Sequence, residues 1–336
     1  MPEQPDLSII IVNWNSAAFV RSCLKSIYAN THGVNFEIVV VDNASYDGCD
    51  ELVKKEFPEV RFVQNAQNEG FARANNLGFS HSGGRNLLFL NPDTAVVGPA
   101  LVTMLTFLEA TADAGIVGAR LLNSDGSVQT SCIQQFPTIL NQALDIERLQ
   151  AAFPKSRLWN IGPLFENANG GVSVDAISGA CLMIRRSVFE QVGQFTTDYF
   201  MYAEDVDLCW KVKQVGRKNC YVGKATVVHH AGRCSQQKEE QSSSAVMTRD
   251  SLAKFLEKTR GRPYAAVYRL AMLVAGVCRT GLLGAFMLMP IRDKSRKSAR
   301  ISFKKWRRVV RWSLGLEPWA AKLAQPRTRE AKMVES

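Results

Sequence analysis

Residues 7–15 read "LSIIIVNWN", and this stretch decides the fold of the chain. Its β-branched run predicts a strand, and its nearly unbroken apolar character predicts burial on both faces of a sheet. The pattern recurs as "FEIVVVDNAS" at residues 36–45, as "RFVQN" at 61–65 and as "NLLFLNPD" at 86–93. We therefore predict four buried strands in this part of the chain.

Helical patterns separate the predicted strands. Between the first two strands, apolar residues recur at helical spacing, at Phe19, Val20, Leu24 and Ile27. A second helix begins with "ELVKKEF", and the segment "EGFARANNLGFSHS" separates the third strand from the fourth. Strands that alternate with helices form right-handed units, so the sequence predicts an α/β fold with a mostly parallel central sheet and flanking helices. In such sheets ligands bind beyond the carboxyl ends of the strands.

Three of the predicted strand ends are polar. They carry Asn13 and Asn15 after the first strand, Asp42 after the second, and Asn91 and Asp93 after the fourth. Taken singly, an aspartate at the position of Asp42 is also common as a turn former or a helix N-cap. Asn91 and Asp93, on either side of a proline, also fit a β-turn. Together, carboxylates and amides at neighbouring strand ends would converge on one crevice, which favours a ligand site.

A glycine-containing loop, "NEGFARANNLG", follows the third strand. Gly70 is expected at a sharp turn and Phe71 near the start of a helix, while Asn75 stands where a stronger helix former is usual. Such loops before helices suit phosphate groups. The sequence has no Walker lysine motif, no GxGxxG after the first strand and no GxSxG elbow, which argues against P-loop hydrolases, dinucleotide dehydrogenases and serine hydrolases.

Composition describes a globular chain with a basic end. The 336 residues are 46% hydrophobic and 21% charged, with a formal net charge of +10. Residues 292–312 hold ten Lys or Arg and one acid, a local charge of +9 that leaves +1 for the rest. Eight cysteines without a CxxC pair predict reduced, mostly buried thiols. The apolar run at residues 7–12 is too short for a signal segment, so no secretory signal is expected.

Seven motifs occur in order and together resemble one known family. They are "SIIIVNWN", "VVVDNASYDG", "NEGFARANNLG", "LLFLNPDT", "ARLLNSDGSVQTS", "ISGACLMIRRSVFEQVGQF" and "FMYAEDVDLCWKVKQVGRKNCYVGKATVVHHAG". The set resembles the inverting family 2 glycosyltransferases with the glycosyltransferase A fold, within them the rhamnosyltransferase-like branch that builds bacterial surface glycans. The resemblance implies a Rossmann-like catalytic domain over residues 1–245, with a sugar-donor half at about 1–120 and an acceptor half at about 121–245. A helical, amphipathic and basic region over residues 246–336 would follow.

For the first half, the resemblance implies a nucleotide sugar bound at the strand ends. Asp42 would contact the base, which suits uracil and thymine alike, and Asp93 would bind a divalent cation, Mg²⁺ or Mn²⁺, on the diphosphate. The Asn-Pro-Asp motif has one carboxylate, so the cation would take its other ligands from phosphate and water. The remaining residues implied to bind the sugar donor are Asn13, Asn15, Asn68, Gly70, Phe71, Asn75 and Asn91.

The second half holds the predicted base, in "FMYAEDVDLCWKV" at residues 200–212. The resemblance implies that Asp205 removes the proton from the acceptor hydroxyl and that Glu204 positions the acceptor or the base. Apolar neighbours and adjacent acids would raise the pKa of Asp205. The alternative is a solvated helix start with favourable acids in its first turn, an interpretation that we keep for Asp207.

Further positions come from the same resemblance. Gly179 and Ala180 would pass under the donor sugar and would be small because the substrate lies against them. His229 would complete the metal site or touch phosphate, and it matches the family spacing better than His230; a surface histidine pair is the alternative. Thr196 stands where the family usually has an aspartate. The resemblance therefore does not predict how the nearby loop contacts the acceptor.

The C-terminal region predicts contact with a membrane. Residues 265–289 are membrane-like, but Arg269 and Arg279 shorten the run below the roughly 20 residues that a span needs. These arginines are ten positions apart and would share one helical face. Further on, a helical wheel groups apolar Phe303, Trp306, Val310 and Leu314 opposite basic Arg300, Lys304, Arg307, Arg308 and Arg311, with Ile301 and Trp312 on the basic arc.

Residues 265–314 are therefore predicted to bind an anionic membrane surface. Helix packing with a solvated charge run is the alternative. Nucleic acid is not expected as a partner, because the sequence has no recognised nucleic-acid-binding module.

We predict a metal-dependent inverting glycosyltransferase of cell-surface polysaccharide synthesis. It would move a sugar, with rhamnose as one candidate, from a dTDP- or UDP-linked donor to a hydroxyl of a lipid-linked glycan at the cytoplasmic face of the membrane. Two alternatives stay open. A nucleotidyltransferase of similar fold would have no use for the Glu204-Asp205 pair, and a non-catalytic membrane scaffold would not need intact Asp42, Asp93 and Asp205.

Overall fold

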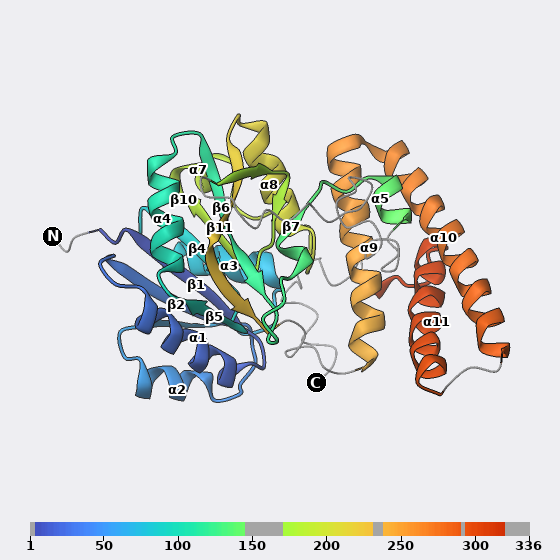
Figure 1. Cartoon of the computed structure of the whole chain (residues 1–336), viewed down its shortest axis with the longest axis horizontal. Helices are drawn as coiled ribbons and strands as arrows, with labels where there is room; N and C mark the ends of the chain where they lie inside the picture. Colours follow the sequence, from blue (N-terminus) through green and yellow to red (C-terminus); the bar gives the residue numbers. More distant parts are fainter. Residues whose placement is uncertain (1–3, 145–170, 231–237, 290–292, 320–336) are drawn as a thin grey trace, which may run out of the picture. The chain divides into compact units, whose positions relative to one another are not determined.

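The computed structural model describes residues 4–144, 171–230, 238–289 and 293–319. The chain divides into two compact units (Figure 1). The first, an α/β unit, holds residues up to 196 and residues 204–236, and the second, a helical unit, holds residues 197–203 and those from 237 onward. The predicted division at residue 245 falls inside the helix α9, Lys238–Arg260.

A nine-stranded sheet forms the centre of the first unit, in the order β3-β2-β1-β4-β10-β6-β11-β5, with β8 paired to β11. Its strands are β1 Leu7–Asn13, β2 Phe36–Asp42, β3 Arg61–Gln64, β4 Asn86–Leu90, β5 Thr94–Val97, β6 Ala114–Leu122, β8 Val172–Val174, β10 Cys181–Arg185 and β11 Lys218–His229. Strands β1 to β4 run parallel, as do β6 and β11. Strand β10 is antiparallel to both β4 and β6, and β5 and β8 are antiparallel to β11. The predicted mostly parallel sheet is confirmed.

Helices flank this sheet. They are α1 Ala17–Asn30, α2 Cys49–Glu56, α3 Phe71–Ser80, α4 Ala100–Ala110, α7 Arg186–Gln191 and α8 Glu204–Gln214. The short helix α5 spans Ile139–Ala143, and β7 Ile133–Gln134 and β9 Ala176–Ile177 form a separate short ladder. Helix α1 packs against β5, α3 against β1 and β2, and α4 against β6 and β11. Helix α3 can lie close to the sheet because Gly78 has no side chain. A Cβ atom at this position would lie 2.5 Å from Ile10 Cγ2.

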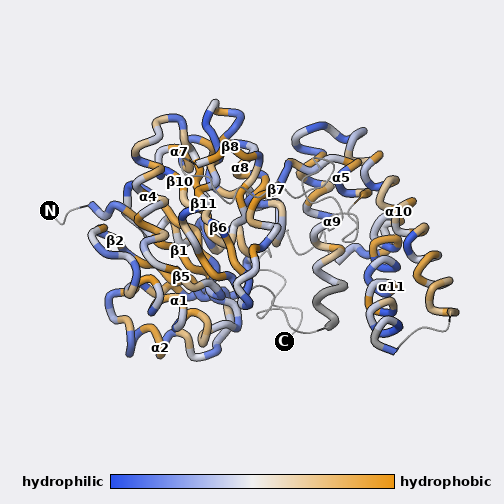
Figure 2. The backbone as a smooth tube through the Cα atoms, viewed as in Figure 1, coloured by the Kyte–Doolittle hydropathy of each residue, from blue (hydrophilic) through white to orange (hydrophobic). Residues whose placement is uncertain are grey.

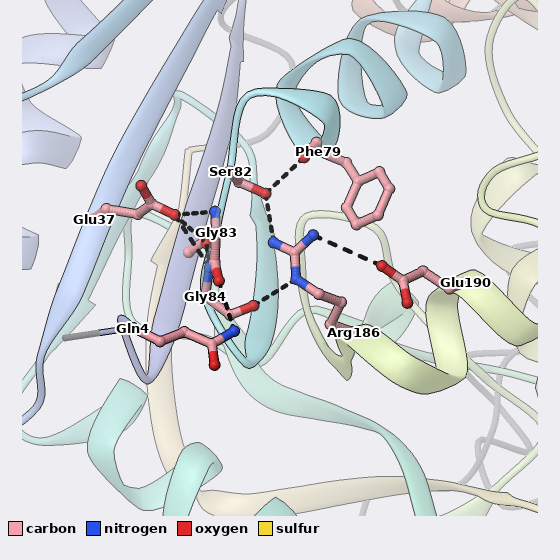
Figure 3. Close-up of polar contacts among 9 residues, drawn as sticks. Gln4, Glu37, Phe79, Ser82, Gly83, Gly84, Arg186 and Glu190 are labelled. Atoms are coloured by element: carbon pink, nitrogen blue, oxygen red, sulfur yellow. Dashed lines mark hydrogen bonds and ion pairs between the residues drawn. The ribbon is translucent and has the colours of Figure 1, made fainter. Parts of the chain in front are cut away.

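A polar cluster closes the amino ends of the central strands (Figure 3). Glu37 Oε1 accepts hydrogen bonds from Ser8 Oγ at 2.7 Å and from the backbone N–H groups of Gly83 and Gly84. Arg186 donates from Nε to the Gly84 carbonyl at 2.6 Å and from Nη2 to Ser82 Oγ at 2.9 Å. We call Glu37, Arg186 and the loop 82–84 the amino-end clamp. It fixes the entry of the chain into β4.

Three helices make up most of the second unit: α9, α10 Arg262–Leu288 and α11 Asp293–Ser313. Helices α10 and α11 pack together, and α9 packs against both. Helices α10 and α11 differ in hydropathy, as Figure 2 shows: α10 is largely hydrophobic and α11 is largely hydrophilic. The parts of the predicted basic region at residues 290–292 and 320–336 lie outside the described residues.

Two tryptophans of α11 face the interior of the helical unit. Trp306 is 8% exposed and Trp312 is 1% exposed, and Trp312 Nε1 donates to Asp250 Oδ1 at 3.1 Å. The prediction that placed Trp312 on the basic arc is therefore wrong, because α11 buries a wider side against two helices. The guanidinium groups of Arg269 and Arg279 lie over the rings of Trp312 and Trp306, 4.7 and 4.1 Å from their centroids. Both arginines thus face α11, as their spacing predicted.

The described cysteines are free thiols, which agrees with the sequence prediction. Cys278 is exposed, whereas the others are buried: Cys23, Cys49, Cys132, Cys181, Cys209 and Cys220. Burial raises the pKa of Cys23 and of Cys181 to about 12, which keeps these thiols protonated and unreactive. Cys234 lies outside the described residues.

Candidate active site

The ends of β1 and β2 meet through a pair of polar side chains. Asn13 and Asp42 are paired in register, and Asn13 Nδ2 donates to Asp42 Oδ1 at 2.7 Å. The Asn13 side chain is fully buried and also receives the backbone N–H of Ser16 at 3.1 Å. Asn13 is therefore placed to hold Asp42, whereas Asn15 is exposed just beyond it, its N–H bonded to Ser45 Oγ at 2.9 Å.

Asp42 is a buried carboxylate held by several donors. Its Oδ2 accepts from the Ser45 N–H at 2.9 Å and from Gln64 Nε2 at 2.6 Å. Burial alone would raise the pKa of Asp42, but the hydrogen bonds from Ser45, Gln64 and Asn13 outweigh it and lower the pKa. The sequence did not reveal the roles of Ser45 and Gln64. A carboxylate has about four acceptor positions, and the Asn13 amide, the Gln64 amide and the hydroxyl and backbone N–H of Ser45 fill them at Asp42.

The loop before α3 is shaped by amides. Asn68 Oδ1 accepts from Asn43 Nδ2 at 2.8 Å and from the Gly70 N–H at 2.9 Å. Gly70 has φ of 81°, a conformation that favours glycine, and α3 begins at Phe71 as predicted. Asn75 is 1% exposed and donates to the Phe71 carbonyl at 3.0 Å. The structure thus uses the side chains of Asn68 and Asn75 within the loop and helix, and it adds Asn43, which the sequence analysis missed.

The start of β10 joins the end of β4 to the predicted base. The Asn91 N–H donates to the Ala180 carbonyl at 3.0 Å, and the Gly179 N–H donates to Asp205 Oδ2 at 2.8 Å. A Cβ atom on Gly179 would lie 3.3 Å from Asp205 Cβ. The atoms that keep Gly179 small in this structure belong to Asp205, and this differs from the predicted contact with substrate.

Asp205 stands in the first turn of α8 and is partly exposed. Its Oδ1 accepts from the N–H of Val206 at 2.8 Å, so each carboxylate oxygen receives one backbone hydrogen bond. Burial in an apolar setting raises the pKa of Asp205, and these two hydrogen bonds offset the increase only in part. A carboxylate with a raised pKa is a stronger proton acceptor than a solvated one.

The neighbouring acids of α8 are buried, so the alternative of a solvated helix start does not hold. Glu204 is 6% exposed and Asp207 is fully buried. Asp207 Oδ2 accepts from Thr196 Oγ1 and lies 3.8 Å from Lys211 Nζ. The prediction of a solvated Asp207 is therefore wrong: it is a buried carboxylate, and Thr196, at the position where an aspartate is usual, serves as its hydrogen-bond partner.

His229 and Asp93 face each other beside the end of β4. His229 Nε2 lies 3.3 Å from Asp93 Oδ1 and 3.4 Å from Asn91 Nδ2. His230 points elsewhere, with Nδ1 at 2.7 Å from Ser124 Oγ, so the geometry favours His229 as the partner of Asp93. A carboxylate and an imidazole suit Mg²⁺ or Mn²⁺ when phosphate and water supply further ligands. The described residues include no cluster of three His, Cys, Asp or Glu that could hold an ion alone.

Left-handed backbone conformations gather next to the predicted site residues. Among the described residues, six that are not glycine have positive φ: Asn15, Ala44, Tyr46, Gln194, Tyr202 and Ala203. Three of them follow β1 and β2, and Tyr202 and Ala203 come directly before Glu204 in the chain. Such conformations each cost roughly 1–3 kcal/mol and persist mainly where function requires them. Asn15, Ala44 and Tyr46, which follow β1 and β2, support a site at the carboxyl ends of these strands.

The fold is that of the glycosyltransferase A enzymes. The mannosyltransferase PcManGT from Pyrobaculum calidifontis, solved with GDP-Man and Mn²⁺, superposes with a TM-score of 0.57 at 18% identity, over 96% of this chain and 87% of the other. At this identity the likeness shows the fold alone.

The sequence comparisons give the family. Residues 8–193 match the model of glycosyl transferase family 2, more than half of the chain, and the protein belongs to this family. The hexosyltransferase Agl10 of low-salt glycan biosynthesis in Haloferax volcanii is 30% identical over 66% of this chain and 66% of its own length. The N-acetylglucosaminyl-diphospho-decaprenol L-rhamnosyltransferase of Mycobacterium tuberculosis is 27% identical over 67% of this chain and 76% of its own. These relatives place the chain in the rhamnosyltransferase-like branch. The aligned part of this chain spans just under two thirds of the length of Agl10.

Proposed function

We propose that this protein is a metal-dependent, inverting glycosyltransferase that moves a sugar from a dTDP- or UDP-linked donor to a hydroxyl of a lipid-linked glycan. The observation that carries the proposal is the position of Asp205, a partly exposed carboxylate with raised pKa, bonded to Gly179 where β10 begins beside β4. The decaprenol-linked substrate in the name of the mycobacterial relative supports the lipid-linked acceptor, and the branch supports rhamnose as the first sugar to test.

Asp205 acts as the general base. Backbone N–H groups hold each of its oxygens, which leaves a lone pair on each for the acceptor hydroxyl. The acceptor oxygen forms a bond to the anomeric carbon on the face opposite the diphosphate, and the carbon–oxygen bond to the diphosphate breaks. The hydroxyl proton passes to the Asp205 carboxylate, and the electron pair leaves with the diphosphate, so the anomeric configuration inverts.

Asp42 and Asp93 divide the recognition of the sugar donor. Asp42 would accept the imide N–H that uracil and thymine both present, in place of one of its present donors. Asp93 and His229 fit a divalent cation, which when bound would neutralise charge on the leaving diphosphate. The single carboxylate of this pair predicts weak binding of the cation without the nucleotide.

Helix α10 presents an uncharged outer face. Val267, Leu270, Val274 and Val277 recur at helical spacing with 53–59% exposure. Among the described helices, α10 meets the length and composition of a membrane span, so the expectation that its two arginines leave too short a run is wrong, and only 11% of its apolar window is buried. Its two arginines point at the tryptophans of α11 instead. This outer face supports binding to acyl chains at a membrane surface.

Helix α11 supplies the matching charge. Lys297, Arg300, Lys304 and Arg307 recur at intervals of three and four residues and are all exposed. Each cation near an anionic bilayer contributes about 1 kcal/mol, so four are sufficient for measurable binding. We infer a peripheral or monotopic association with the cytoplasmic face, where the nucleotide-sugar donor would also be available.

The activity is tested with purified protein, membrane lipid extract and a panel of radiolabelled sugar nucleotides. We expect transfer of label to the lipid fraction from a dTDP- or UDP-sugar, dependent on Mg²⁺ or Mn²⁺ and abolished by chelator. Transfer that persists undiminished in chelator would overturn the metal requirement. No transfer from any donor, with nucleotide release instead, would favour a different acceptor class.

The membrane contact is tested by flotation with liposomes. We expect binding to anionic vesicles at low salt and partial release at high salt, because charge and apolar contact both contribute. Leu270→Asp should weaken the salt-resistant part, whereas Val215→Asp, at an exposed apolar position of the first unit, should not. Full-length protein that stays unbound at low salt would overturn this part of the proposal.

A further inference from the structure

We propose that Gln129 is a positioning residue that fixes the tautomer of His229 and turns its Nε2 lone pair toward Asp93. Gln129 lies in "ARLLNSDGSVQTS", the one family-like motif to which the sequence analysis assigned no role. The expected consequence of this positioning, metal binding by His229, rests on the proposed function. The structural core of the inference, the tautomer, can be tested alone.

The backbone holds Gln129 firmly. It lies between β6 and the 3-10 turn Thr130–Cys132, and its N–H donates to the Leu121 carbonyl at 2.9 Å. The residue is 5% exposed. Because the side chain is buried and its backbone is fixed, its amide group has few alternative positions.

The orientation of the amide follows from its partners. One end of the Gln129 amide lies 2.6 Å from the His229 carbonyl oxygen, which can only accept a hydrogen bond. The NH₂ group must therefore face that carbonyl, and Oε1 must face the imidazole, where it lies 2.9 Å from Nδ1. Since Oε1 also can only accept, Nδ1 must carry the proton.

The second ring nitrogen is then free of a proton in the neutral imidazole. His229 Nε2 lies 3.3 Å from Asp93 Oδ1, and the nearby Asn91 Nδ2 has hydrogens to donate at 3.4 Å. Two backbone features keep these groups together: Thr94 pairs with His229 across β5 and β11, and the His230 N–H donates to the Asp93 carbonyl at 2.8 Å. A metal ion needs the bare lone pair, and a partner behind the ring that fixes it commonly sets the affinity.

The tautomer is measured first, by ¹⁵N NMR of histidine-labelled protein without metal at a pH where histidine side chains are neutral. The His229 signal is assigned from its loss in His229→Gln. We expect the form protonated at Nδ1 in the wild type and a mixture in Gln129→Met, which keeps the size of the side chain but cannot accept the proton. A wild-type signal from the form protonated at Nε2 would overturn the inference without any variant.

Metal affinity is measured second, by electron paramagnetic resonance of Mn²⁺ with UDP present. Outer partners of metal-binding histidines typically change affinity about 10–100-fold, and we expect a loss of that size in Gln129→Met. Ser124→Ala is the matched control, because it removes the partner of His230 and should leave affinity unchanged. Wild-type affinity in Gln129→Met would overturn the inference.

The two measurements separate the inference from the proposed function. If the wild type shows the Nδ1-protonated form but binds no Mn²⁺, the metal requirement fails while the positioning role of Gln129 stands. If Mn²⁺ binds and the tautomer is the other one, the proposed function stands and the role of Gln129 fails.

Discussion

The two ends of the central sheet both hold carboxylates, and they hold them in opposite ways. At the amino ends, one oxygen of Glu37 receives two backbone donors from the loop 82–84 and one from Ser8 of β1, and Arg186 bonds to the same loop (Figure 3). At the carboxyl ends, Asp205 receives one backbone donor on each oxygen and stays partly exposed, just after two left-handed residues. The comparison of these two residues teaches that Glu37, saturated by local donors, supports the fold, whereas Asp205, held only from behind, is available for chemistry; Asp42, also at the carboxyl ends, is itself held by several donors.

The largest effect should come from Asp205→Asn. An amide keeps the size of the side chain but cannot take the acceptor proton, so we expect turnover to fall about 10²–10⁴-fold. Nucleotide-sugar binding and the urea midpoint of unfolding should change little. Turnover above a third of the wild-type value would show that the base lies elsewhere and would break the comparison.

Asp93→Ala should have the next largest effect. The diphosphate charge would be left uncompensated, and we expect turnover and donor affinity to fall together, by about 10²-fold, since metal stabilisation is worth several kcal/mol. Calorimetric titration with the nucleotide sugar in the presence of Mn²⁺ measures the affinity. Asp125→Ala is the control, because Asp125 is an exposed aspartate that bonds only within its own loop in the described structure, to Ser127. Equal losses in both variants would contradict a specific role.

At the opposite end of the sheet, Glu37→Ala should change stability and leave turnover per folded molecule unchanged. It would leave the donors of Ser8 and Gly83 without their acceptor, whereas the Gly84 N–H keeps its bond to Ser8 Oγ, and we expect a loss of about 1.5–3 kcal/mol in the free energy of unfolding. Glu37→Gln keeps an oxygen at the same place and should lose less. Denaturant unfolding measures the stability of both Glu37 variants. A fall in turnover with intact stability would contradict the distinction between a structural amino end and a functional carboxyl end.

The smallest effect should be a difference in pH dependence. Because burial raises the pKa of Asp205 above its ordinary value, the folded state binds its proton more tightly than the unfolded state does. The contribution of this group is fully present below the unfolded pKa and is lost as the pH rises through the folded pKa. Wild-type protein should therefore lose stability relative to Asp205→Asn across that acid range. The opposite slope would mean that the carboxylate is stabilised in its charged form.

The sequence predicted the parts of the fold that depend on periodicity. Long apolar runs identify β1, β2 and β4 because burial on both faces leaves few polar positions, and Asp42 and Asp93 are found because they follow such runs. Ser45, Gln64 and Gln129 escaped prediction, since a hydrogen bond between residues 129 and 229 leaves no trace in local spacing. The left-handed conformations of Ala44 and Tyr202 were equally hidden, because tertiary contacts and not residue type impose them.

The wheel of α11 failed for a related reason. A wheel assumes one buried side, but α11 packs against both α9 and α10, so its buried arc reaches Trp312. Asn13 shows the converse case. It was found by its position at a strand end, yet its buried amide serves Asp42, and only the three-dimensional arrangement separates a residue that binds from one that supports it.

The stacking of Arg269 and Arg279 on the tryptophans of α11 also sets an order of events during synthesis. When α10 leaves the ribosome, α11 is not yet folded against it, and both arginines are bare. An arginine at the centre of a candidate span costs about 2.5–3.5 kcal/mol in insertion, so the insertion machinery should pass this helix by. Only after α11 has been made are the charges covered and the outer face of α10 left uniformly apolar. The chain should therefore reach the bilayer after its release, as a finished bundle.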